Sequence, residues 1–150
     1  MKRFAFVPLL LALAACSGQE TPRTAEFIAD QPAHSDFGNL RVRYSAIPTL
    51  SLNEETARHY EVERNADSGL LVVALRKTDS GEEQPIEGSV KAIVRDLDER
   101  AQHLDLRPVR TGDYVDYIAT FRPHPRDTFR FDITVHANGQ DHNIQFQRNY

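Results

Sequence analysis

Six histidines and several clustered carboxylates are the residues of this chain that could bind a metal ion or transfer a proton. His136, Asp141 and His142 lie close to Asn138-Gly139, and His124 lies between two prolines, so metal ligands are present in the sequence. In a hairpin turning at Asn138-Gly139, His136 faces Asp141 on one side of the sheet, whereas His142 points to the other side. We therefore expect no metal site and no bound cofactor.

Acidic residues also recur at a spacing that could supply an acid and a base for hydrolysis. Asp96, Asp98 and Glu99 form one group, and Asp113 with Asp116 forms a second. Arginines alternate with both groups, so charge pairing at solvated strand ends explains them. No nucleophile elbow, phosphate loop or dinucleotide fingerprint occurs in the sequence. We expect no catalytic residues and a protein that is not an enzyme; the alternative is a small periplasmic hydrolase or metal-dependent enzyme.

Two tyrosines in one predicted strand are candidates for a binding patch. Tyr114 and Tyr117 have opposite parity, so one of them should face outward beside charged neighbours. Exposed tyrosines are common in binding sites, although in β-sandwiches they also fix loops at corners.

The N-terminus has the pattern of a bacterial export signal. Lys2 and Arg3 are followed by ten apolar residues at 4–13, a stretch that is too short to cross a bilayer as a helix. Leu13-Ala14-Ala15-Cys16 resembles the lipobox, which predicts removal of residues 1–15 and lipidation of Cys16. The alternative is a plain secretory signal in which Cys16 is a chance residue. Ser17 favours delivery to the outer membrane, with the protein facing the periplasm.

The exported part is divided by composition into two segments. Residues 16–35 are rich in polar residues and prolines, which predicts a lipidated Cys16 followed by a flexible tether, and the folded domain is expected at 36–150. Removal of Lys2 and Arg3 leaves 16 basic against 22 acidic residues, so we expect no nucleic-acid partner. After removal of residues 1–15 no Met remains, and Cys16 is the single Cys, so a soft-metal carrier is not expected.

Short apolar runs separated by turn signals predict seven antiparallel strands in an immunoglobulin-like β-sandwich. These strands are expected near 40–47, 70–78, 87–97, 103–110, 114–122, 127–136 and 142–149. The continuous apolar run Leu70 to Leu75 predicts a strand that is covered on both faces.

One short helix is expected between the first two of these strands. Ser51 and Glu54 have the spacing of a capping box, and Leu52 to His59 has helix-forming composition. The last two strands are expected to pair so that partner numbers add to 277, which places Phe131 opposite Phe146 and Ile133 opposite Ile144.

Three separate segments resemble a family of exported bacterial proteins called domain of unknown function 4426. The first is residues 37–46 with the helix that follows, the second is residues 107–109 with 112–113 and 117–121, and the third is residues 128–133. The resemblance implies an all-β, immunoglobulin-like sandwich and brings no activity, cofactor or catalytic residue. The sequence as a whole predicts a lipid-anchored, non-catalytic interaction or accessory module. Its expected partners are the membrane, through the lipid on Cys16, and an envelope protein or glycan; a purely structural role as a spacer or assembly factor is a further alternative.

Overall fold

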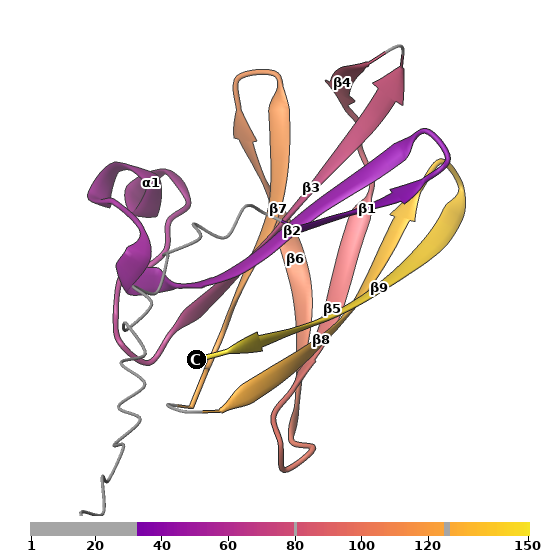
Figure 1. Ribbon diagram of the computed structural model, residues 1–150. Coiled ribbons are helices and arrows are strands. Elements are labelled where there is room, and N and C mark those ends of the chain that lie inside the picture. The colour runs from indigo at the N-terminus through magenta and orange to yellow at the C-terminus, as the bar shows by residue number, and fades with distance from the viewer. Residues whose placement is uncertain (1–32, 80, 125–126) are drawn as a thin grey trace, which may run out of the picture.

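The computed structural model describes residues 33–79, 81–124 and 127–150, which form an all-β domain with one short α-helix (Figure 1). The predicted lipidation site Cys16, the signal segment 1–15 and most of the predicted tether lie outside the described residues. No helix within the described ranges is long and apolar enough to cross a membrane. The strands are β1 (Ala33–Phe37), β2 (Leu40–Pro48), β3 (Gly69–Asp79), β4 (Glu82–Pro85), β5 (Ser89–Arg95), β6 (Ala101–Thr111), β7 (Tyr114–Phe121), β8 (Thr128–Ala137) and β9 (Gln140–Asn149).

All seven predicted strands are present, and the structure adds β1 and β4. The sequence did not signal either strand, because AHSDF and EEQP are polar and show no alternation of apolar residues. Both are short strands that add to one side of a longer neighbour. The described residues therefore include a strand, β1, that starts at Ala33, inside the segment 16–35 predicted as a tether.

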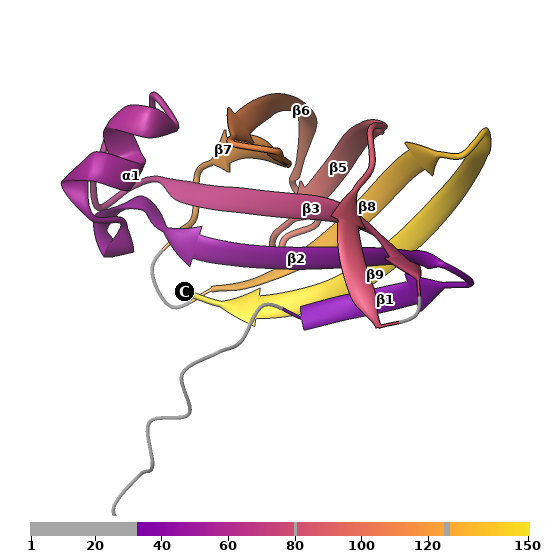
Figure 2. The same ribbon diagram turned by 90° about the horizontal axis from the view of Figure 1, so that it is seen from above.

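The strands follow the order β1-β2-β3-β7-β6-β5-β8-β9, with β4 also pairing with β3. β6 joins the two layers, because residues 101–106 pair with β5 and residues 107–111 pair with β7. Figure 2 shows the layer of β2 and β3 above the layer of β8 and β9. The predicted all-β sandwich is therefore confirmed, with nine strands in place of seven.

The core lies between the two layers and contains the inward-facing residues of alternating strands. In β2 this alternation places Leu40, Val42 and Tyr44 inside, while the arginines between them face outward. The rings of Phe131 and Phe146 stack at 4.6 Å, and the ring of Phe121 meets Phe131 edge-on at 5.2 Å. Such aromatic contacts add stability beyond the area that they bury.

The helix α1 (Glu54–His59) covers the outer face of the first layer at one end. Leu52 and Ala57 are buried there against outward-facing residues of β3, β6 and β7, which explains why the run at Leu70 to Leu75 is apolar throughout. The predicted capping box at Ser51 is wrong. Residues Thr49–Ser51 form a 3-10 turn, and Asn53 is the N-cap, its side-chain oxygen accepting a 2.7 Å hydrogen bond from the Thr56 N–H.

The C-terminal hairpin has the register that the sequence predicted. Phe131 pairs with Phe146, Ile133 with Ile144, and His136 with Asp141. Asn138 and Gly139 both have positive φ, 53° and 73°, as a type I′ turn requires.

Candidate functional site

A buried arginine lies on the outer face of the first layer, just beyond the part that α1 covers. Arg76 of β3 points to the same side as Leu70 and is 9% exposed. Its Nη1 donates hydrogen bonds to the carbonyl oxygens of Leu75 at 2.9 Å and Val115 at 3.3 Å. The guanidinium is therefore tied to the backbone of two neighbouring segments, which fixes its position.

Asp116 of β7 supplies the negative charge beside this arginine. Its Oδ1 lies 3.5 Å from Arg76 Nη2, and its Oδ2 accepts a 2.9 Å hydrogen bond from the hydroxyl of Tyr60 at the end of α1. Burial, together with the hydrogen bond to this carboxylate, raises the pKa of Tyr60 to about 12. Tyr60 thus remains a hydrogen-bond donor at neutral pH and connects α1 to the charged pair.

Tyr114 covers the other side of the arginine and is 47% exposed. The Arg76 guanidinium carbon lies 4.8 Å from the centre of the Tyr114 ring, a cation–π distance. The expectation that one of the two tyrosines faces outward is confirmed. Tyr117 is the inward-facing one, and its hydroxyl accepts a 2.9 Å hydrogen bond from the Gly88 N–H.

These side chains line an open hollow of about 590 Å³ between α1 and the sheet, which we call the α1 hollow. His59 closes one part of it, with Nε2 at 2.8 Å from Thr111 Oγ1. Glu55 and Thr56 of α1 complete the lining. Aromatic rings, a fixed arginine and carboxylates within one hollow can recognise a partner by stacking, hydrogen bonds and charge.

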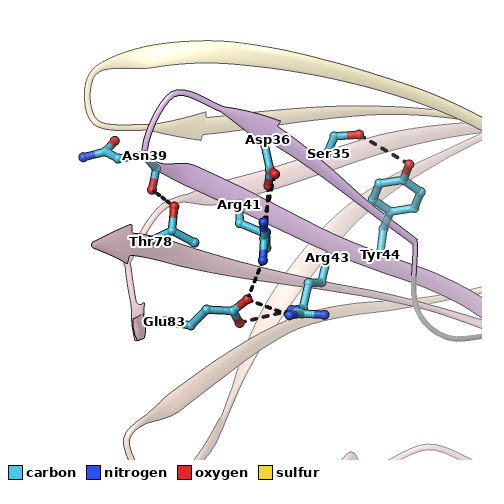
Figure 3. Close-up of polar contacts among 8 residues, drawn as sticks. All are labelled: Ser35, Asp36, Asn39, Arg41, Arg43, Tyr44, Thr78 and Glu83. Carbon is cyan, nitrogen blue, oxygen red and sulfur yellow. Dashed lines mark hydrogen bonds and ion pairs between the residues drawn. The ribbon is translucent and has the colours of Figure 1, made fainter. Parts of the chain in front are cut away.

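A second set of charges continues this face toward β1 and β4 (Figure 3). Glu83 of β4 accepts hydrogen bonds from Arg43 at 2.6 and 3.1 Å and from Arg41 at 3.1 Å, while Arg41 also binds both oxygens of Asp36. Arg41 lies directly opposite Arg76 in the β2–β3 register. Like charges in that position are unfavourable, and each arginine has its own carboxylates: Arg41 contacts Asp36 and Glu83, and Arg76 contacts Asp116. The hydrogen bond from Arg43, followed by that from Arg41, keeps the pKa of Glu83 below its usual value.

The predicted acidic candidates do not converge on one site. Asp116 lies in the α1 hollow, whereas Asp113 and His124 are exposed elsewhere. Asp96 is buried at the β5–β6 turn, where Arg100 donates both its backbone N–H, at 2.9 Å, and its side-chain Nε, at 2.7 Å. The predicted pairing with arginines is confirmed for Asp96 and Asp98, which both contact Arg100, and Glu99 contacts Arg130.

The predicted histidine geometry is also confirmed. His136 Nδ1 lies 2.7 Å from Asp141 Oδ1 on the outer face, while the His142 ring packs 4.6 Å from that of Phe37. No group of three or more His, Cys, Asp or Glu side chains that could hold a metal ion occurs among the described residues.

The sequence pointed to Tyr114 and Asp116 but not to Arg76 or Tyr60. Arg76 follows an apolar strand and looks like the start of a solvated strand end. Only the alternation along the strand indicates its place: Arg76 and Leu70 are six residues apart, so their side chains lie on the same face of β3, the face that the helix covers. The contact of Tyr60 with Asp116 joins residues 56 positions apart, which no local pattern reveals.

These features define an antiparallel β-sandwich with a helix over part of one outer face. The chain belongs to the DUF4426 family, a domain of unknown function, whose family model matches residues 34–150. It is similar to a solved DUF4426 family protein from Pseudomonas aeruginosa, with 24% identity over 79% of this chain and 94% of that one, and a TM-score of 0.67. A comparison with curated proteins finds no match.

Two further solved structures share the fold at much lower identity. One is a copper-bound variant of FetP from uropathogenic Escherichia coli, at 8% identity and a TM-score of 0.58. The other is a copper-bound variant of Campylobacter jejuni P19, at 6% identity and a TM-score of 0.57. In both comparisons the matched region covers 79% of this chain and 94% of the other protein's chain.

The Asp96 contacts predict how stability depends on pH. Burial alone would raise the Asp96 pKa, but the Arg100 backbone N–H and guanidinium outweigh it and lower the pKa below the ordinary value of 3.8. A lowered pKa contributes stability that is complete above 3.8 and is lost as the pH falls further. Asp96→Asn should reduce the free energy of unfolding at pH 7 and weaken its decrease in acid, measured by urea unfolding at several pH values.

The matched control is Asp98→Asn, because Asp98 contacts the same arginine but its side chain is 75% exposed. Asp98→Asn should follow the wild type at every pH. An Asp96→Asn variant with the wild-type pH dependence would show that this carboxylate does not contribute to acid unfolding.

Proposed function

We propose that this protein is a lipid-anchored, non-catalytic accessory module of the bacterial envelope that docks a protein or glycan partner through the α1 hollow. The anchor places it on a membrane, in our proposal the outer membrane facing the periplasm. The sandwich supplies a rigid support, and the hollow supplies the contact surface.

The anchor is supported by the N-terminal sequence. A basic start, ten apolar residues and the Leu-Ala-Ala-Cys ending at Cys16 together fit a lipoprotein signal. Anchoring by several acyl chains is effectively permanent, unlike anchoring by one chain.

The docking role is carried by one observation, the half-exposed Tyr114 ring held over a buried arginine. Tyrosine and arginine are enriched among residues that dominate binding energy, most of all where their positions are fixed before binding. Arg76 is fixed by two backbone carbonyls and Asp116, and Tyr114 is in turn held by Arg76. Because these side chains are already fixed, they would lose little conformational entropy when a partner docks.

The FetP and P19 variants are copper-bound, but we do not propose that this protein binds copper. No three His, Cys, Asp or Glu side chains among the described residues lie together as metal ligands could, and residues 16–150 contain no Met. The described carboxylates that could serve a hydrolase lie apart, and Asp96, Asp98 and Glu99 are held in ion pairs. These features favour a binding role over an enzymatic one.

The anchor can be tested by the intact mass of the protein isolated from its own membranes. We expect a chain that begins at Cys16 and carries acyl chains, and we expect Cys16→Ala to lose both the added mass and the retention in membranes. An unmodified, freely soluble wild-type chain would contradict the anchored part of the proposal.

The docking surface can be tested by photo-crosslinking in intact cells. Tyr114→p-benzoylphenylalanine places the reactive ring in the α1 hollow, and we expect one discrete adduct that mass spectrometry identifies as a peptide or a glycan. Leu97→p-benzoylphenylalanine is the control, because Leu97 is 70% exposed at the distant β5–β6 turn. The same adducts from both positions, or none from position 114, would contradict docking at the hollow.

A further inference from the structure

β9 is a ten-residue strand whose second side has no partner. It pairs with β8 along its whole length, and no other strand in the described part of the chain pairs with it. β1 runs near β9 in both views (Figures 1 and 2) without pairing with it, and the Phe37 ring of β1 lies 4.6 Å from the His142 ring of β9. The strand at the opposite end of the order, β1, is five residues long and pairs with β2.

The hairpin geometry identifies the backbone groups that point to this open side. A two-residue type I′ turn makes the flanking pair, Ala137 and Gln140, exchange hydrogen bonds. At the other end of the hairpin the Tyr150 N–H donates a 3.0 Å hydrogen bond to the Asp127 carbonyl. An even-numbered residue therefore bonds toward β8 there too, as Gln140 does next to the turn. Even-numbered residues of β9 therefore bond to β8, and the backbone N–H and C=O groups of residues 141, 143, 145, 147 and 149 point outward.

This edge carries one feature that opposes pairing, the charged Arg148 on the same face as Phe146, but it lacks others. Residues 140–150 include no proline and no lysine, which are common guards of exposed edges. Asp141 is held by His136 on the outer face. The inward-facing Phe146 and Tyr150 are only partly buried, so a strand added here would cover more of both rings.

We propose that β9 pairs with β9 of a second copy of this chain, antiparallel and centred on Gln145. In this register Gln145 faces Gln145 of the second copy. Asn143 likewise faces Gln147 of the second copy, and Ile144 faces its Phe146. Amide groups therefore meet amide groups on the outer face, and apolar side chains meet on the inner face. No like-charged carboxylates or arginines are placed opposite each other, because Asp141 faces Asn149 and Arg148 faces His142.

The self-complementary sequence is the reason for choosing a second copy over a foreign strand. A two-fold interface requires one surface to match itself, and here each residue type meets a compatible one. This interface lies on the second layer and does not involve the α1 hollow, so the proposal is independent of the proposed function.

The test introduces a charge at the two-fold centre in the full mature chain, made soluble by Cys16→Ala, with the mass measured by sedimentation equilibrium. The wild-type chain should be a dimer. Gln145→Lys and Gln145→Glu each place like charges opposite one another and should raise the dissociation constant at least about tenfold, equal to about 1.4 kcal/mol. An equimolar mixture of the two variants should restore the dimer as a heterodimer.

Lys91→Glu is the control, because the Lys91 side chain is 76% exposed on β5, which β8 separates from β9. It should leave the dimer unchanged. A second readout is a disulfide between two copies of Gln145→Cys, since hydrogen-bonded antiparallel pairs have Cα atoms about 5.5 Å apart, within disulfide range. A wild-type monomer, an unaffected Gln145→Lys dimer, or no restored heterodimer would each overturn the proposal.

Discussion

The ion pair between Arg76 and Asp116 is the interaction on which the outer face of this protein depends. A guanidinium that is 9% exposed is unfavourable unless its charge is balanced and its N–H groups are bonded. Two backbone carbonyls and the Asp116 carboxylate provide both. Because Asp116 also binds Tyr60 and Arg76 also supports Tyr114, the same pair fixes the end of α1 and the exposed ring of the α1 hollow.

This outer face changes character along the strands. Close to Leu70 it is apolar and covered by α1, around Arg76 it forms the open α1 hollow, and toward Arg41 it carries a set of partly buried ion pairs. The outer face of this one layer therefore has three different regions, while its inner face packs into the core throughout. Arg41 and Arg76 can be cross-strand neighbours because Asp36 and Glu83 balance the charge of Arg41 and Asp116 balances that of Arg76.

Much of the fold could be predicted because strands such as β2 and β8 alternate between apolar and polar residues, and because β3 begins with a continuous apolar run. The register of β8 and β9 followed from Asn138-Gly139 and from the sorting of Phe131 and Ile133 to one face. The polar strands β1 and β4 could not be predicted, since their places depend on pairing with β2 and β3 rather than on their own composition. The capping box failed because the 3-10 turn includes Ser51, so the helix starts later. Tyr114 could be found by parity, but the contacts of Arg76 and Tyr60 arise from residues far apart in the chain.

The most direct test of the central role of the Arg76–Asp116 pair is a double-mutant cycle with Arg76→Met and Asp116→Asn, measured by urea unfolding at pH 7. Asp116→Asn alone leaves a buried charge without its partner, whereas the double variant removes that charge and leaves an apolar side chain of similar length. We predict a coupling energy of at least about 1 kcal/mol, with the double variant more stable than the sum of the single effects requires. Additivity of the two single effects, to within about 0.5 kcal/mol, would contradict the account.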